Sequence, residues 1–346
     1  MSDRYGRRTA LLASMVGNIV SVLLWVVAAD FRTFVLSRVV GGLSEGNVQL
    51  AMAIATDVSD DSTRSSTMAL IGVCFSVAFT FGPALGAWLS TIAVIKTNPF
   101  AAAAGFSLFL IVAETVYLYF CLPETLPGKA VEAGATEKVT STSEEVLATS
   151  SKTTQLRTNS HSRLNAVHFL FLLFFSGMEF SLPFMTYDLF GYTAAKNGRL
   201  LGFVGLVASV LQGGVTRRIP PLLSVRIGLV ACQIAFLLLG SLTTESSLYL
   251  AAACLAATSA TVVTGLNALS SFEAHSGERG GKLGILRSWG QVGRGVGPVL
   301  FTSVYWWAGR EVAYGAGAIG MSAVLLLAFF GLQSPPWAHT AKAKTL

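Results

Sequence analysis

Ionisable side chains stand inside several long apolar stretches of this chain. Arg38 and Glu45 lie in one stretch, Glu179 lies in another, and Arg294 lies in a third. A charge at the centre of a membrane helix costs ~2.5–3.5 kcal/mol on insertion scales, so an idle one is disfavoured. A guanidinium group attracts anions, and a carboxylate in an apolar site can take up a proton. We therefore expect Arg38 and Arg294 to attract an anionic solute and Glu45 or Glu179 to carry a proton.

Spacing places some of these side chains on a common helix face. Arg38 and Glu45 are seven residues apart, and Gln49 follows four residues later, so the three share a face of one expected helix. Arg287 and Arg294 are also seven apart. We expect Arg38 and Arg287 near the cytoplasmic ends of their helices, where a long cationic side chain can also snorkel to the interface.

The deepest of these residues, Glu45, Glu179 and Arg294, are expected to line a central cavity. For each carboxylate two roles stay open. It can bind a proton, since burial disfavours its charged form, or it can hold a buried arginine in a structural ion pair.

The elements that position these residues are predicted to be membrane-spanning helices. The chain of 346 residues is 53% hydrophobic and only 12% charged, against about 25% charged residues in soluble domains. About 20 apolar residues in a helix cross a bilayer core. The sequence predicts an all-α polytopic membrane protein with ten helices, at residues 9–29, 34–56, 67–90, 99–122, 164–187, 197–216, 224–242, 247–271, 283–307 and 311–332.

The distribution of basic residues predicts the orientation of the helices and excludes one class of partner. If the N-terminus is cytoplasmic, 17 of the 24 Lys and Arg residues fall on the cytoplasmic side and five on the other, with Arg38 and Arg294 inside spans. By the positive-inside rule, both termini are expected to be cytoplasmic. The net charge of +6 is spread over short segments between apolar spans, so a nucleic-acid partner is not expected.

The chain divides into four segments. Residues 1–122 hold four expected spans, residues 164–333 hold six, and residues 334–346 form a tail. Residues 123–163 are rich in Ser, Thr and charge and have few large apolar side chains. Such a composition cannot build a core, so this segment is expected to be a disordered cytoplasmic linker.

An internal repeat relates the two groups of spans. At a constant offset of 215 residues, Gly82-Pro83 matches Gly297-Pro298, and Arg64 matches Arg279. A repeat of this kind predicts duplicated halves. The second Gly-Pro pair lies in the fifth helix after the linker, whereas only two spans precede the span with the first pair. We therefore expect two helices of a twelve-helix arrangement to be missing from the front.

The opening residues carry a recognisable motif. "SDRYGRR" resembles the loop signature between the second and third helices of the major facilitator superfamily. Asp3, Arg4, Gly6, Arg7 and Arg8 match its core, and the glycine that usually leads the signature is absent.

Further stretches strengthen this resemblance. "RVVGGLSEG" (38–46) is similar to the fourth-helix motif of the superfamily, "GPALG" (82–86) to the fifth-helix motif of its antiporters, and "LPETL" (122–126) to the exit from its sixth helix. "GNVQLAMAIATDV", "HFLFLLFFSGMEFSLPF" and "LGILRSWGQVGRGVGPVLFTSVYWWAG" resemble the tetracycline-transporter-like proteins of eukaryotes.

The resemblance implies a latch at the cytoplasmic face. Asp3 is expected to accept hydrogen bonds from a helix N-terminus, which favours anions, and Arg7 or Arg8 is expected to pair with Asp57. In the superfamily such contacts hold the two halves together and break as the transporter rocks. The alternative is that the basic cluster only anchors the topology.

Glycine and proline residues in the repeated helices have a mechanical interpretation. Pro83 and Pro298 each remove a backbone donor and are expected to kink their helices. Gly82, Gly86 and Gly297 let neighbouring helices approach closely. A role in packing alone stays open.

Together these features predict a major facilitator fold with about ten of its twelve helices. The resemblance implies a transporter of small amphipathic drugs or organic anions that works by alternating access, with protons as coupling ion in antiport. No metal or other cofactor is expected. We expect the protein to be a monomer in the lipid bilayer and its partner to be a small-molecule substrate. "GLSEG" fits a hydrolase pattern but lies in an apolar helix, whereas that motif needs a strand-turn-helix context. The competing prediction is a transport-inactive scaffold or regulatory membrane protein.

Overall fold

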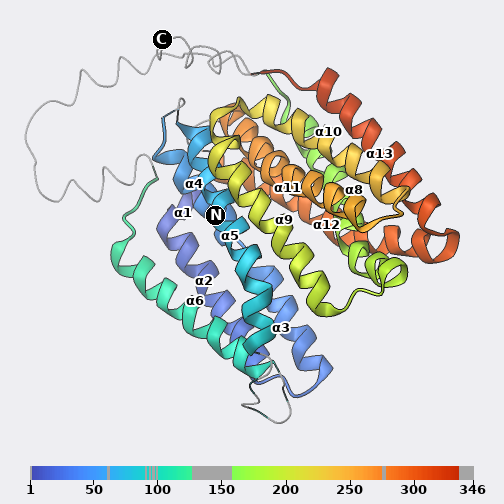
Figure 1. Ribbon diagram of the computed structural model, residues 1–346. Helices are drawn as coiled ribbons and strands as arrows, with labels where there is room; N and C mark the ends of the chain where they lie inside the picture. The colour runs from blue at the N-terminus through green and yellow to red at the C-terminus, as the bar shows by residue number, and fades with distance from the viewer. Residues whose placement is uncertain are drawn as a thin grey trace, which may run out of the picture.

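Long helices build this protein. The computed structural model describes residues 2–60, 63–89, 92, 95, 98, 100–126, 158–274 and 278–334. Apart from one isolated bridge between Ile95 and Asn98, the regular elements of these ranges are helical (Figure 1). They are α1 (Ser2–Tyr5), α2 (Arg7–Val26), α3 (Phe31–Ser44), α4 (Asn47–Asp57), α5 (Arg64–Leu89), α6 (Ala101–Cys121), α8 (His161–Phe190), α9 (Ala194–Gly214), η1 (Thr216–Arg218), α10 (Pro221–Gly240), α11 (Glu245–Glu273), α12 (Arg279–Ala308) and α13 (Arg310–Gly331).

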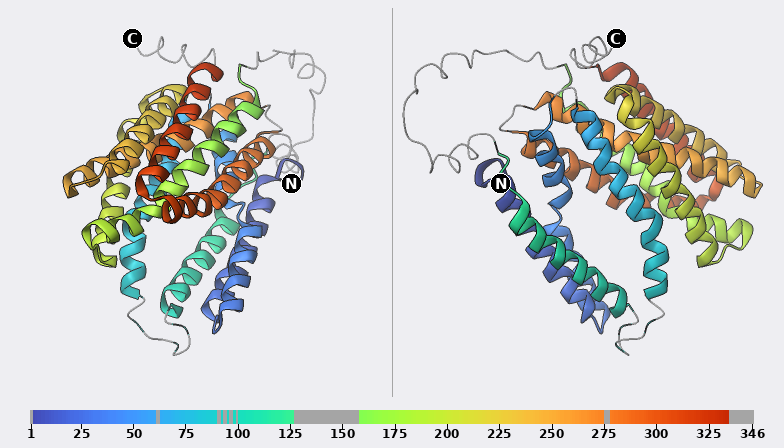
Figure 2. Two further views of the ribbon diagram at one scale, coloured as in Figure 1. Left: turned by 90° about the vertical axis from the view of Figure 1, so that its right-hand side faces the viewer. Right: turned by 60° about the vertical axis from the view of Figure 1, so that its left-hand side comes forward.

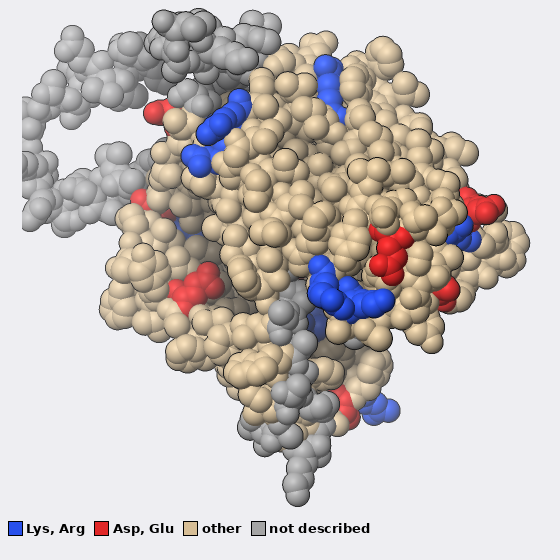
Figure 3. All heavy atoms as spheres, in the orientation of Figure 1, with Lys and Arg blue, Asp and Glu red and all other residues tan. Residues whose placement is uncertain are grey.

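The composition of the helices confirms the expected all-α membrane fold. In the described ranges, seven helices are long and apolar enough to cross a bilayer, among them α2, α6, α8, α10, α11 and α13. On the face turned to the viewer in Figure 3, uncharged side chains cover most of the surface, and charged side chains lie in a few separate groups. A surface of this kind suits contact with lipid rather than with water.

The helices form two groups that meet along a few contacts. In the first group α2 packs between α3 and α6, and in the second α8 packs on α12 and α10 packs on α11 and α13. The two groups touch where α5 lies against α9 and α11 and where α4 lies against α12 (Figure 1, Figure 2). These contacts leave room between the groups for the cavity described below.

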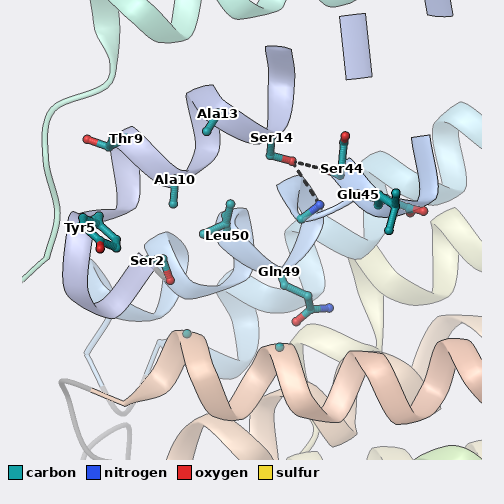
Figure 4. Close-up of a pocket in the computed structure, with 14 residues that line it drawn as sticks. Ser2, Tyr5, Thr9, Ala10, Ala13, Ser14, Ser44, Glu45, Gln49 and Leu50 are labelled. Atoms are coloured by element: carbon teal, nitrogen blue, oxygen red, sulfur yellow. Dashed lines mark hydrogen bonds between the residues drawn. The ribbon is translucent and has the colours of Figure 1, made fainter. Parts of the chain in front are cut away.

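One predicted helix is broken, which corrects the expectation for residues 34–56. The chain forms α3 and α4 instead, and Glu45 and Gly46 lie at the break between them. The Ser14 hydroxyl of α2 donates to the Ser44 carbonyl oxygen at 2.5 Å and accepts the Gly46 N–H at 3.1 Å (Figure 4). It thereby satisfies backbone groups that a continuous helix would pair internally. Arg38 and Glu45 consequently do not share the face of one helix.

Close backbone contact joins α8 to α12. A Cβ atom added at Gly293 would collide with the Phe169 carbonyl oxygen, and one added at Gly297 would collide with that of Leu173. Glycine is therefore required at both positions for the two helices to approach as they do. The matching Gly82 of α5 has no atom within 4 Å of an added Cβ, and neither has Gly86. Helices α5 and α12 both continue through their prolines.

Replacing Gly297 with alanine is expected to destabilise the protein markedly, because the new methyl group would push α12 away from α8. Overpacking a well-packed core costs about 1–3 kcal/mol or more. Gly295→Ala, two residues away in the same helix, is the matched control because its added Cβ meets no atom within 4 Å. Thermal unfolding in detergent measures both variants. Equal unfolding midpoints for the two would contradict this account of the α8–α12 contact.

The predicted linker lies mostly outside the described residues, which exclude 127–157. Its last residues are held in place, since Asn159 donates its backbone N–H to Glu273 at 2.8 Å and its side-chain amide to Glu273 at 2.9 Å. The same side chain receives the Gln333 N–H at 2.8 Å. The start of α8 and the ends of α11 and α13 therefore share one polar contact. The tail beyond residue 334 also lies outside the described part.

Candidate functional site

A buried ion pair lies at the end of the molecule that holds the first residues. The Arg7 Nε atom is 2.7 Å from the Asp57 carboxylate, and both side chains are 0% exposed. Arg279 of α12 is 3.6 Å from the same carboxylate, and Arg7 also pairs with Asp3. Buried charges are tolerated only when they are paired in this way. We call Asp3, Arg7, Asp57 and Arg279 the terminal cluster.

Asp3 connects the terminal cluster to the start of α12. Its two carboxylate oxygens accept the backbone N–H groups of Gly280 at 3.1 Å and Gly281 at 2.7 Å. These are among the unpaired donors of a helix N-terminus, where a negative charge is favoured. The Asp3 contact therefore bridges the two groups of helices. A Cβ at Gly280 would collide with Arg7, so a side chain there would disturb the cluster.

The other basic residues of the motif have different surroundings. Arg8 does not reach Asp57 but donates to the Tyr119 carbonyl oxygen and lies over the Tyr119 ring, 5.5 Å from its centre. Arg4 is exposed and lies against the neighbouring Tyr5 ring. Gly6 has a φ of 102°, a conformation that glycine adopts without strain.

Glu124 caps α2, a role that no sequence motif predicted. Its carboxylate accepts the backbone N–H groups of Arg7 at 2.8 Å and Arg8 at 3.3 Å, and also those of Thr125 and Leu126. Burial raises the pKa of Glu124, but these hydrogen bonds outweigh that effect and hold its pKa below the ordinary value. The "LPETL" stretch marked the position, although its partner could not be read from the sequence.

Glu124→Gln is expected to lower the stability of the protein at neutral pH. It should also remove part of the loss of stability that the unmodified protein shows at acidic pH. Because the pKa of Glu124 is lowered in the folded state, its charged carboxylate stabilises the protein at pH values above 4.5, the ordinary pKa of this group. That contribution is lost as the pH falls through the lower folded-state pKa. Unfolding midpoints should therefore differ at pH 7 and converge at acidic pH. A difference between the two proteins that stays constant with pH would contradict this role.

A cavity of about 450 Å³ lies between the two groups of helices. Its walls come from α4, α5, α8, α9, α11 and α12. Of the residues predicted to face a substrate, Glu45, Gln49, Glu179 and Arg294 line this cavity. We call it the central cavity.

Two ion pairs lie on the wall of the central cavity. Arg294 donates to Glu179 at 3.0 Å, and the two side chains are 39% and 26% exposed. Arg287 donates to Glu45 at 2.8 Å, with 22% and 51% exposure. Both arginines come from α12, while Glu179 comes from α8 and Glu45 from the break between α3 and α4. The first pair therefore joins helices of one group, and the second joins the two groups.

The predicted placement of Arg38 was wrong. Snorkelling was one of the roles left open for Arg287, and the structure places this residue on the wall of the central cavity, where it binds Glu45. Arg38 does not line this cavity. Its guanidinium group lies 4.8 Å from the centre of the Trp25 ring, near the end of α2 farthest from Arg7, so it is not at the end where it was expected. The aromatic ring provides a cation–π partner for an exposed arginine.

Apart from Gln49, the uncharged polar residues of the central cavity were not predicted. Gln212 of α9 accepts the Ser76 hydroxyl of α5 at 2.6 Å, which joins the two groups. Asn267 of α11 and Gln291 of α12 also line the cavity. Gln291 lies between Arg287 and Arg294 on α12. Amide side chains within apolar spans were the signal that could have identified them.

A second cavity of about 610 Å³ lies closer to the terminal cluster. Residues of α1, α2, α4 and the start of α12 line it, and Glu45 and Gln49 belong to both cavities (Figure 4). Glu45 at the break between α3 and α4 and Gln49 in the first turn of α4 therefore form part of the wall between the two cavities.

Comparisons with known proteins identify the family to which this chain belongs. The Major Facilitator Superfamily model matches residues 1–298. Major facilitator superfamily domain-containing protein 10 of Mus musculus is 34% identical over 342 residues, covering 95% of this chain and 72% of that protein. The protein of the same name from Homo sapiens is 33% identical and covers 99% and 76%. Tetracycline resistance protein, class B, of Escherichia coli is 25% identical and covers 88% and 73%.

Solved structures give the same result. The crystal structure of the human organic anion transporter MFSD10 (TETRAN) matches with a TM-score of 0.80 and 30% identity, covering 94% of this chain and 78% of that one. The proton:xylose symporter XylE matches with a TM-score of 0.76 at 14% identity, which supports the fold alone. The predicted resemblance to tetracycline-transporter-like proteins is thus confirmed, and the chain belongs to the Major Facilitator Superfamily.

Proposed function

We propose that this protein carries small amphipathic organic anions across a membrane by alternating access, with protons as the coupling ion. The observation that carries the proposal is the Arg294–Glu179 pair, which is half-buried on the wall of the central cavity. A guanidinium group with spare donors can bind a carboxylate or sulfonate. The name of the human relative, an organic anion transporter, supports this substrate class.

The apolar part of the lining suits an amphipathic molecule. Phe75, Phe171, Phe175 and Leu182 face the same central cavity as the two ion pairs. Ligand sites commonly combine an apolar wall with a few polar groups that fix orientation. We infer that the apolar body of the solute packs on these side chains and that its charged group reaches Arg294.

The terminal cluster has the properties expected of a latch. Asp3 holds Gly280 and Gly281, and Asp57 lies near Arg279, so both contacts link the first group of helices to α12. Opening this end of the molecule would require these contacts and the Glu45–Arg287 pair to separate. We propose that they close one face of the transporter while the central cavity opens to the other.

Orientation and oligomeric state follow from the same features. The excess of basic residues at this end supports a cytoplasmic terminal cluster, with both chain ends cytoplasmic. Each ion pair of the central cavity is completed within one chain, which supports a monomer as the working unit. The sequence motifs favour antiport, in which the proton moves in the direction opposite to the solute.

The proposal is tested with the purified full chain in liposomes and naphthalene-1-sulfonate as the probe. A sulfonate stays ionised at every working pH, so it does not cross the lipid in a neutral form. We expect saturable uptake that exceeds uptake by protein-free liposomes. Uptake that equals the protein-free control, with correctly folded protein present, would contradict the proposed function.

A further inference from the structure

We infer that Gln49 and Asn267 select organic anions that also carry an uncharged group with N–H or O–H donors. Both amide side chains line the central cavity. Gln49 belongs to α4 and Asn267 to α11, so they come from different groups of helices. The inference rests on the proposed function and narrows its substrate class. It follows from two buried acceptors without a donor and from their position relative to Arg294.

The amide oxygens of these two residues lack donors. Gln49 is 8% exposed and Asn267 is 2% exposed. Among the residues that the structure describes, neither the Gln49 Oε1 atom nor the Asn267 Oδ1 atom receives a hydrogen bond. A buried acceptor without a donor is unfavourable, and surroundings of low polarity increase that cost. A solute that donates to these oxygens would remove the cost, whereas a solute without a donor would not.

The remaining contacts of the amides show which kind of partner is missing. The Asn267 Nδ2 atom donates to the Val263 carbonyl oxygen at 3.0 Å, one turn earlier in α11. This hydrogen bond uses the donor side of the amide and leaves its oxygen for another partner. By contrast, the Gln212 amide oxygen in the same cavity already accepts the Ser76 hydroxyl at 2.6 Å. The open capacity of Gln49 and Asn267 is therefore for accepting hydrogen bonds, and the solute must provide the donor.

Packing places the two amides close to one level of the central cavity. Gln49 lies one turn before Met52 in α4, and Asn267 directly precedes Ala268 in α11. Met52 and Ala268 belong to one apolar cluster, which also contains residues of α5 and α12. Met52 lines the central cavity as well, so this cluster forms the floor of the cavity on the side of the terminal cluster. A substituent with two donor hydrogens at this floor can reach both amides and thereby contact both groups of helices.

The Arg294 guanidinium group lies farther from the terminal cluster than the two amides. The contact between Asp57 and Arg279 provides a common reference for α4 and α12. At 1.5 Å per residue, Gln49 lies about 12 Å from Asp57 along α4. By the same measure, Arg294 lies about 22 Å from Arg279 along α12. A two-ring aromatic body with a substituent at each end spans a separation of this kind, so its anionic end can reach Arg294 while its other end reaches the amides.

Water does not remove this selectivity. Ordered water commonly serves buried polar groups and can donate to both amide oxygens. A solute group that displaces such water and reproduces its hydrogen bonds keeps the affinity, whereas a group that cannot reproduce them loses affinity. The preference for a donor is therefore expected whether or not water occupies the floor of the empty cavity.

The test compares three sulfonates in liposomes that contain the full chain. At pH 7, 6-aminonaphthalene-2-sulfonate carries two N–H donors on an uncharged amine at the end opposite the sulfonate. Its analogue 6-(dimethylamino)naphthalene-2-sulfonate has no donor, and naphthalene-2-sulfonate lacks the substituent. For the amino compound we expect the ratio of the maximal uptake rate to the half-saturating concentration to be at least about tenfold higher than for the other two.

Equal ratios for the three sulfonates would overturn the inference and leave the proposed function standing. The absence of uptake for all three would contradict the proposed function itself. This comparison uses the unmodified protein, so it does not depend on the folding of any variant.

Near-isosteric variants test the assignment to the two amides. Gln49→Met and Asn267→Leu each remove one acceptor, so each should reduce the preference for the amino compound. The double variant should abolish the preference and still take up naphthalene-2-sulfonate. Gln233→Met is the matched control, because the Gln233 amide oxygen also lacks a donor among the described residues but does not line the central cavity. An undiminished preference in the double variant, or an equal loss of preference in Gln233→Met, would overturn the assignment.

Discussion

Arg294→Ala is expected to reduce the uptake of organic anions more than any other single change in the central cavity. The substitution removes the guanidinium group that would bind the substrate and leaves Glu179 without the partner it has at 3.0 Å. Truncating one member of a hydrogen-bonded charge pair costs ~2–5 kcal/mol. A change of 1.4 kcal/mol corresponds to a factor of ten in affinity. The ratio of the maximal uptake rate to the half-saturating anion concentration should therefore fall by at least roughly 30-fold.

Two further variants separate the loss of binding from a loss of folding. Arg294→Lys keeps the charge but lacks the planar fork of donors, so it should retain an intermediate rate. Arg294→Gln combined with Glu179→Gln removes both charges and leaves no unpaired carboxylate. It should fold as well as the unmodified protein and still fail to take up the sulfonate. Normal uptake by the double variant would show that the pair has no part in substrate binding.

The second large effect is expected at the terminal cluster. Arg7→Ala removes a fully buried guanidinium group that contacts Asp57 at 2.7 Å and also pairs with Asp3. Breaking a buried ion pair by removing one partner costs ~3–5 kcal/mol, because the remaining charge stays buried. Among the basic residues that the structure describes, Asp57 would then be left with Arg279, which is 3.6 Å away. The unfolding midpoint in detergent should therefore fall clearly.

Arg4→Ala is the matched control for this prediction, since it removes a basic residue of the same motif from an exposed position. It should leave the unfolding midpoint almost unchanged. Arg7→Lys keeps a positive charge and should fall between the two. If Arg4→Ala and Arg7→Ala have equal effects on stability, the basic residues act only through their net charge, as the topology anchor would.

The helix ranges of this chain could be predicted well from its sequence, because spans of about 20 apolar residues carry a strong signal. The break at Glu45 could not. It depends on Ser14, which is thirty residues away in sequence and provides the hydrogen bonds that a continuous helix would have made. With the break missed, the common face inferred for Arg38 and Glu45 was wrong as well.

The candidate site was predicted in its residue types and only partly in its partners. Glu45, Glu179 and Arg294 stood out because charged residues are rare in apolar spans, and all three line the central cavity. The partner of Glu45 is Arg287, from the other group of helices, and spacing along one helix contains no information on such a contact. Asp3 and Asp57 were tied to their partners by the resemblance, whereas the cap formed by Glu124 required the fold.

The location of a bound anion tests the account most directly. We would determine the structure of the full chain with 4-bromonaphthalene-1-sulfonate and locate the bromine by its anomalous scattering. The account predicts that the sulfonate lies in the central cavity within hydrogen-bonding distance of the Arg294 guanidinium group, with the ring on the apolar wall. A sulfonate bound elsewhere, with the Arg294–Glu179 pair undisturbed, would contradict it.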